Sequence, residues 1–96
     1  MNEIRFEWDK LKAVVNKRKH GVSFEEAQTV FYDENAVLFD DPDHSRSEDR
    51  FIMLGMSYKL RALVVSCCER HGDVIRIISA RKAARHEAQY YVEGKI

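Results

Sequence analysis

Three apolar stretches separated by short turns constrain the fold of this chain more than any other feature. They cover residues 50–56, 60–68 and 74–79, with turns at 57–59 and 71–73. Connections this short join antiparallel neighbours, because a parallel crossover needs a dozen or more residues. The first two stretches are mostly apolar on both alternating faces, which indicates central strands of a sheet that is covered on both sides.

Two helices are predicted ahead of these strands. Asp9 can cap the first helix, which ends in a basic turn followed by Gly21. Apolar residues at helical spacing along it are Leu11, Val14 and Val15. Ser23 and Glu26 form a capping box, in which each side chain satisfies the other's backbone amide, and this second helix ends near Tyr32. The short connection predicts an antiparallel helix pair.

The remaining elements complete a single α+β domain. Short strands are expected at 4–8 and 36–39, followed by an acidic loop, and a last helix is expected over 80–93 with Ser79 as its N-cap. Ninety-six residues, 45% of them hydrophobic, suffice for one core and are too few for two. We therefore expect one domain over 1–96, with an N-terminal helix pair, an antiparallel β-sheet and a C-terminal helix.

Charge is unevenly distributed although the net charge is zero. Residues 24–50 carry nine acidic and two basic side chains, whereas residues 1–23 and residues 76–96 each have a net charge of +3. The overall field does not draw the chain to nucleic acid, but a local anion site is compatible with this pattern. No apolar run has the length of a membrane span, so we expect a cytoplasmic protein that needs no membrane. Cys67 and Cys68 are predicted to be buried thiols.

A cluster of arginines spans the last predicted strand and the start of the helix after it. Arg76 lies within that strand, and Arg81 and Arg85 belong to the predicted helix. Converging guanidinium groups would suit a phosphate, because each planar fork bonds two oxygens at once. The alternative is that the arginines form surface ion pairs with the acidic middle, where Glu48 and Asp49 precede a central strand.

A second group of titratable side chains ends the first helix. Lys19 and His20 could extend an anion site, and a histidine exchanges protons near neutral pH. The alternative is that both are cations that stabilise a helix C-terminus. The histidines do not pair with carboxylates or thiols at ligand spacing, so the sequence predicts no metal and no other cofactor.

Several separated motifs resemble the BrnT family of bacterial toxins, and they span nearly the whole chain in the right order. They are Phe6-Glu7-Trp8-Asp9, Lys12, Asn16, Lys19-His20-Gly21-Val22-Ser23-Phe24, Glu26-Ala27, Glu48-x-Arg50 followed by Gly55, and Arg76 through Ala83 followed by Glu87. The chain departs from the family in two places. Ala84 stands where threonine is frequent, and Cys67 and Cys68 stand where polar or aromatic residues are usual.

The resemblance implies a ribonuclease toxin of a type II toxin–antitoxin system with a RelE-like fold. It implies metal-independent RNA cleavage that inhibits translation and growth. It also implies neutralisation by a BrnA-type antitoxin, whose ribbon-helix-helix portion alone contacts operator DNA. The competing hypothesis is a non-catalytic binding module that joins an antitoxin and acts as co-repressor of its operon.

The residue assignments follow from the chemistry of that cleavage. A 2′ hydroxyl attacks the adjacent phosphate, and fixed cations stabilise the charge that builds on the phosphate oxygens. The residues assigned to catalysis are Arg76, Arg81, Arg85, Glu48 and His20, and those assigned to RNA binding are Lys19, Arg50, Lys82 and Tyr91. Glu48 and His20 are alternative bases, and Lys19 or a C-terminal tyrosine is the candidate acid or positioning group.

Overall fold

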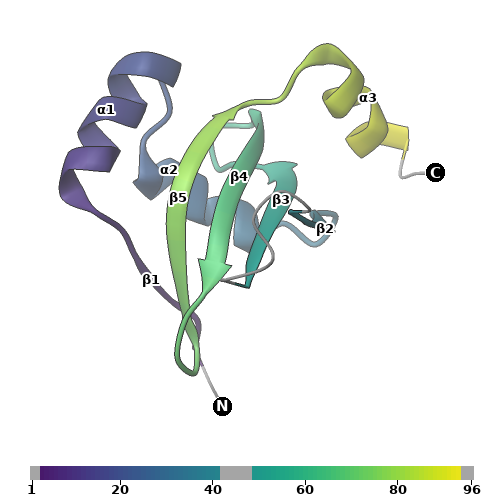
Figure 1. The fold of residues 1–96 in the computed structure, drawn as a ribbon. Helices are drawn as coiled ribbons and strands as arrows, with labels where there is room; N and C mark the ends of the chain where they lie inside the picture. Colours follow the sequence, from purple (N-terminus) through teal and green to yellow (C-terminus); the bar gives the residue numbers. More distant parts are fainter. Residues whose placement is uncertain (1–2, 42–48, 94–96) are drawn as a thin grey trace.

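The computed structural model describes residues 3–41 and 49–93. Its elements are β1 (Arg5–Glu7), α1 (Lys10–His20), α2 (Phe24–Gln28), a 3-10 helix η1 (Thr29–Tyr32), β2 (Val37–Asp40), β3 (Arg50–Met56), β4 (Ala62–Glu69), β5 (Val74–Lys82) and α3 (Arg85–Glu93). The strands form a five-stranded sheet in the order β1-β5-β4-β3-β2 (Figure 1). The predicted α+β class is confirmed. No helix in the described ranges is long and apolar enough to cross a membrane.

The pairing of the strands is antiparallel from β2 to β5, and for β3, β4 and β5 this is what the short turns predict. The first strand is an exception, because β1 runs parallel to β5 with Arg5 opposite Val74 and Glu7 opposite Arg76. The expectation of a wholly antiparallel sheet is therefore wrong at this edge. Between β1 and β5 the chain passes through α1, α2, η1 and three other strands, so no tight turn dictates an antiparallel pairing.

The hydrophobic core lies between α2, η1 and one face of the sheet. Its buried residues are Val22, Phe24, Ala27, Val30, Leu63, Val65, Cys67, Ile77 and Ala80. Because side chains alternate along a strand, Val64, Ser66 and Cys68 of β4 face the other side, which we call the front face. In Figure 1, α2 lies behind the sheet. Both thiols are buried, as predicted, and burial raises the pKa of Cys67 to about 12.

The predicted caps of the first two helices are confirmed except for one half of the capping box. Asp9 accepts a hydrogen bond from a first-turn amide, and Gly21 ends α1 with a φ of 73°. Ser23 Oγ accepts from the Glu26 N–H at 3.0 Å. The Glu26 carboxylate, however, binds the Arg61 guanidinium, and hydrogen bonds from Arg61 hold the pKa of Glu26 below its ordinary value. An ion pair between the buried Glu26 carboxylate and the partly exposed Arg61 thus replaces the expected bond to a local amide.

The buried residue of α1 is Asn16. Its side chain makes the hydrogen bonds to the backbone of β5 that a neighbouring strand would make. β1 pairs with β5 only as far as Arg76, and α1 lies beside the next part of β5 (Figure 1). Asn16 Nδ2 donates to the Ala80 carbonyl at 2.9 Å, and Oδ1 accepts from the Ala80 N–H at 3.1 Å. Nδ2 also donates to the Val22 carbonyl at 2.9 Å. The three apolar residues that predicted the helix, namely Leu11, Val14 and Val15, are exposed.

The last strand is longer than predicted, and the last helix begins later. β5 continues to Lys82, so Ser79 lies inside it opposite Ser66 and does not cap a helix. Pairing with the apolar strand β4 outweighs the local capping preference of a serine. The register also shifts, because Ser66 opposes Ser79 whereas Cys67 opposes Ile77. Ile78 is therefore the extra residue of a β-bulge.

Candidate functional site

The bulge in β5 brings Arg76 and Arg81 to the same side of the sheet. Five positions apart in a regular strand, the two side chains would point to opposite faces. With Ile78 extra, Arg76 opposes Cys68 and Arg81 opposes Val64, and both partners belong to the front face. The two arginines thus share a face because of a bulge, whereas the sequence predicts Arg81 in the helix that follows the strand. Arg81 lies in the strand.

Arg50 shares the front face with these arginines. It opposes Cys68 from β3, while Arg76 opposes the same residue from β5. Two strand spacings separate them, or about 10 Å between backbones. Four positions of β4 separate the levels of Arg76 and Arg81, or about 13 Å along the strand. The three cations therefore line a surface long enough for more than one phosphate group.

Carboxylates hold two of these arginines in the free protein. Arg76 Nη1 lies 3.0 Å from Glu7 Oε2, across the β1–β5 pairing. Arg81 binds Glu87 with both terminal nitrogens, at 2.8 and 2.9 Å. Both arginines therefore form ion pairs, as the alternative predicted. Their partners, however, come from β1 and α3 and not from the acidic middle of the chain. Sequence reasoning missed both glutamates, although each stands in the motifs that carry the resemblance.

Glu87 links the arginine cluster to the start of α3. Its carboxylate accepts a hydrogen bond from the Ala84 N–H at 2.7 Å, as the second residue of a capping box does. The hydrogen bonds from Arg81 are the main cause that lowers the pKa of Glu87 to about 2. Such a carboxylate stays ionised at neutral pH and is a poor proton acceptor. Its role is to position Arg81 and to begin the helix.

A hollow of about 320 Å³ between α1 and β5 brings in the second predicted group. Lys19 and His20 line it from the end of α1, and Ser79 lines it from β5 between the two arginines. Ser79 opposes Ser66, so this part of the hollow belongs to the front face. Arg76 also lies near the start of α1. The hydrogen bond from the Lys12 N–H is the main cause that lowers the pKa of Asp9, and the charge of Arg76 contributes to the same shift. We call this site the α1–β5 hollow.

The other predicted site residues have different surroundings. Arg85 is exposed at the first position of α3. Lys82 opposes a core residue of β4 and therefore projects to the face opposite Arg81, so the structure does not bring it to the arginines. Glu48 lies outside the described residues.

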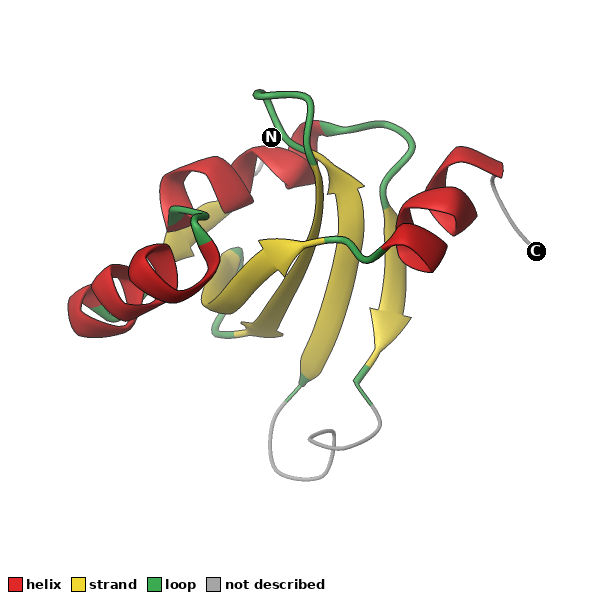
Figure 2. Ribbon diagram, turned by 90° about the horizontal axis from the view of Figure 1, so that it is seen from above, coloured by secondary structure: helices red, strands yellow, loops and turns green. Residues whose placement is uncertain are grey.

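The tyrosines of α3 fasten this helix to the rest of the domain. Tyr91 donates from its hydroxyl to Asp33 Oδ2 at 2.5 Å, and burial together with this bond raises the pKa of Tyr91 to about 12. Burial raises the pKa of Asp33, but hydrogen bonds from Tyr91 and Met56 outweigh it, so the pKa is lowered on balance. Tyr90 packs against Phe39 at 5.7 Å between ring centroids. Figure 2 shows α1 and α3 at opposite ends of the sheet, across the row of strands.

A second hollow on the front face lies between α3 and the sheet. Its volume is about 330 Å³, and Phe39, Tyr90, Arg81 and His86 are among its lining residues. Arg81 thus stands between two hollows along the front face. Within residues 3–41 and 49–93, no group of three or more His, Cys, Asp or Glu side chains is arranged to hold a metal ion.

Comparison with solved structures defines the class of fold. The crystal structure of the Brucella abortus ribonuclease toxin BrnT, at 1.1 Å resolution, matches with a TM-score of 0.68 and 21% sequence identity. The match covers 86% of this chain and 100% of that chain, so the two share a fold. No curated protein sequence matches.

The family follows from the sequence motifs over most of the chain. A family model described as "Ribonuclease toxin, BrnT, of type II toxin-antitoxin system" matches residues 8–87. The chain therefore belongs to the BrnT family of ribonuclease toxins, and the resemblance stated from its motifs is confirmed. A toxin of such a system has an antitoxin as its partner.

Proposed function

We propose that this chain is a metal-independent endoribonuclease whose active site is the front face around the α1–β5 hollow. It acts in the cytoplasm and inhibits translation and growth. One observation carries the proposal: the bulge in β5 puts Arg76 and Arg81 on the front face, before and after Ser79, which lines the same hollow as Lys19 and His20. Two arginines on this face, beside a hollow lined by Lys19 and His20, are suited to an RNA backbone.

The arginines contribute to catalysis by stabilising charge. As the 2′ hydroxyl attacks, negative charge develops on the phosphate oxygens, and donors fixed on a strand need no reorganisation to meet it. Each well-placed donor of this kind contributes roughly 2.7 to 4 kcal/mol in better-studied enzymes. Arg76 uses Nη1 for Glu7, which leaves the rest of its fork for a phosphate.

Arg81 reaches the substrate by exchanging one anion for another. Both of its terminal nitrogens bind Glu87, and a phosphate offers the same bidentate geometry. Arg85 and Arg50 contact neighbouring phosphates. The aromatic hollow beside Arg81, lined by Phe39 and Tyr90, takes a base by stacking.

His20 is the proposed proton acceptor, because it lines the α1–β5 hollow and histidine is the most frequent general base in enzymes. It removes the proton from the attacking 2′ hydroxyl. Lys19, on the same hollow, holds a non-bridging phosphate oxygen. The 5′ oxygen leaves and takes up a proton, and the products carry a cyclic phosphate and a 5′ hydroxyl.

The partner we propose is a BrnA-type antitoxin that binds this toxin and carries a ribbon-helix-helix portion. Operator DNA is contacted only through the antitoxin, since the zero net charge of this chain gives no general attraction to DNA. The fold we propose is RelE-like, which is supported by helices ahead of an antiparallel β2–β5 core and a helix after it.

The test is to induce the chain in bacteria and to follow growth and the integrity of total RNA. Three arms are needed: the chain alone, the chain with its neighbouring gene, and the Arg76→Ala/Arg81→Ala variant. The matched control is Lys17→Ala/Arg18→Ala, which removes two exposed cations of α1 that do not line the hollow. Arrest with RNA loss in the wild type and the control, relieved in the other two arms, is the expected result.

The result that counts against the proposal is growth without arrest from soluble, folded wild-type chain. The non-catalytic binding module would then be favoured. The carboxylates already bound to Arg76 and Arg81 would in that case mark an antitoxin-facing surface.

A further inference from the structure

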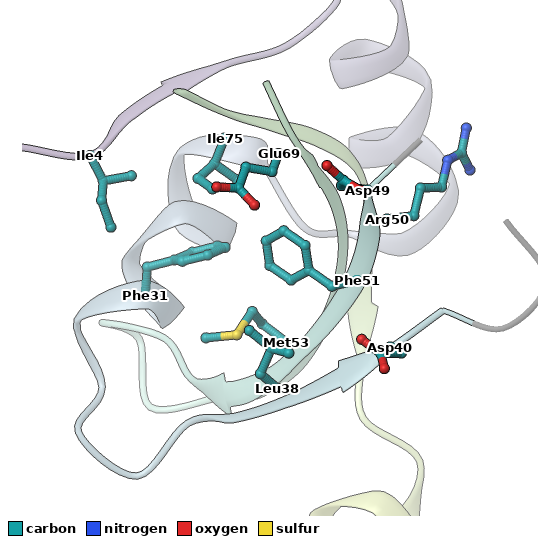
Figure 3. Close-up of a pocket in the computed structure, with 10 residues that line it drawn as sticks. All are labelled: Ile4, Phe31, Leu38, Asp40, Asp49, Arg50, Phe51, Met53, Glu69 and Ile75. Atoms are coloured by element: carbon teal, nitrogen blue, oxygen red, sulfur yellow. The ribbon is translucent and has the colours of Figure 1, made fainter. Parts of the chain in front are cut away.

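The face of the sheet opposite the arginines carries the largest of the described hollows, about 740 Å³ in volume (Figure 3). Its apolar lining residues are Ile4, Phe31, Leu38, Phe51, Met53 and Ile75. Leu38 is 60% exposed and Ile4 is 49% exposed, so this apolar surface is open to water. Exposed apolar groups that gather in one concave place, with polar groups around them, mark interaction sites.

The floor of this hollow is an extension of the core. The Phe31 ring packs edge-on against Phe51 at 6.3 Å between centroids and against Phe6 at 5.0 Å. A surface built from interlocked rings does not need to be ordered when a partner arrives, which favours binding.

Three carboxylates stand around the apolar floor. They belong to Asp40 at the end of β2, Asp49 before β3 and Glu69 at the end of β4, and all three residues are exposed. The Glu69 N–H donates to the Asp49 carbonyl at 3.0 Å, so these two acidic residues are neighbours. Arg50 also borders the hollow, but its guanidinium points away from the apolar side chains (Figure 3). We call this site the acidic hollow.

We propose that the acidic hollow binds the antitoxin, through a segment in which apolar side chains are flanked by lysine or arginine. This inference deepens the proposed function and rests on it only for the existence of an antitoxin. The apolar floor takes the side chains of that segment, and the three carboxylates meet its cations. The acidic stretch of the chain, residues 24–50 with a net charge of −7, would then serve to attract a basic segment of the antitoxin.

The charges exclude two other occupants. RNA would bring phosphates against Asp40, Asp49 and Glu69, and like charges repel. A second copy seated on the same patch would bring its own carboxylates against these three, because a twofold contact joins identical surfaces. A basic partner is the occupant that relieves the repulsion among the acidic residues.

The position of the acidic hollow has a consequence for neutralisation. It lies on the face opposite Arg76 and Arg81, so a segment bound there anchors the antitoxin without touching these arginines. Anchoring and inhibition are then separable by mutation. Variants of the acidic hollow should lose antitoxin affinity and keep RNA cleavage.

The experiment uses the full chain and the purified antitoxin encoded by its neighbouring gene. Leu38→Asp puts a charge on the apolar floor, and Asp40→Lys/Glu69→Lys reverses the carboxylates. Matched controls are Leu60→Asp, at an exposed apolar residue outside the hollow, and Glu25→Lys/Glu34→Lys, at exposed acidic residues of the same stretch. Thermal unfolding establishes that each variant folds. Dissociation constants are measured at low and high salt, and RNA cleavage is measured on the same preparations.

We expect Leu38→Asp to weaken antitoxin binding about 10-fold or more. The double reversal should weaken binding about 10-fold at low salt and less at high salt, because salt screens exposed charges. The controls should stay within about twofold, as contacts outside an interface do. Cleavage by folded variants should equal that of the wild type.

Wild-type affinity in both acidic-hollow variants would overturn the proposal. So would a dimer of the free chain that Leu38→Asp dissociates, or a loss of cleavage in folded Leu38→Asp. If no preparation cleaves RNA, including the wild type, the proposed ribonuclease function fails, and the affinity measurements still decide the docking surface.

Discussion

Replacing Asn16 by alanine removes the side chain that joins α1 to the edge of the sheet. Three buried hydrogen bonds are lost, two to the backbone of Ala80 and one to the carbonyl of Val22, at 2.9 to 3.1 Å. Each is worth about 1 kcal/mol net, so the free energy of unfolding should fall by about 3 kcal/mol. For a chain of this size that is a fall of roughly 12 to 24 °C in Tm.

The assay is urea unfolding, followed by circular dichroism, together with hydrogen exchange at the Ala80 amide. Val15→Ala is the control, because Val15 neighbours Asn16 on α1 and is half exposed, and it should change stability by less than about 0.5 kcal/mol. The Ala80 amide should exchange faster in Asn16→Ala and not in the control. A loss below about 1 kcal/mol, with unchanged exchange at Ala80, would refute the strand-like role of this side chain.

Three further predictions concern the ends of the elements. Hydrogen bonds from Arg81 are the main cause that lowers the pKa of Glu87 from its ordinary 4.5 to about 2, so the ionised carboxylate stabilises the fold fully above pH 4.5 and loses that effect as the pH falls toward 2. The free energies of unfolding of wild type and Glu87→Gln should therefore differ above pH 4.5 and converge near pH 2. Parallel curves of stability against pH would contradict this. Ala84→Thr should supply the missing hydroxyl of the capping box and stabilise the chain by about 1 kcal/mol in urea unfolding, and no gain would argue against a cap there. Gly55→Ala would put a Cβ 2.7 Å from Val30 Cγ1, so it should lower the free energy of unfolding by about 1 to 3 kcal/mol. Adding Val30→Ala should restore part of that loss. A Gly55→Ala variant as stable as the wild type would refute the close approach.

Local signals were sufficient for the elements whose ends depend on neighbouring residues. The caps at Asp9 and Ser23, the glycine that ends α1, and the turns between β3, β4 and β5 all involve residues a few positions apart. Their physics is contained in short sequence windows. The bounds of α1 and β3 could therefore be read from the sequence.

Features that depend on distant partners could not be read in this way. Arg76 is held by Glu7, which lies 69 positions away, and β1 pairs in parallel because β5 offers it an edge. The bulge at Ile78 comes from the match between β4 and β5, and it decides that Arg76 and Arg81 share a face. A polar residue such as Asn16 reads as solvent-facing until its backbone partners are known.

The measurement that tests the central claim most directly is cleavage of a short RNA by purified chain in the presence of a chelator. Wild type, Arg76→Ala, Arg81→Ala and the control Lys17→Ala/Arg18→Ala are compared under single-turnover conditions. We predict chelator-resistant cleavage that yields cyclic phosphate ends, slowed about 100- to 1,000-fold by either arginine variant and unchanged in the control. Equal rates in wild type and both arginine variants, or cleavage that the chelator abolishes, would contradict the account.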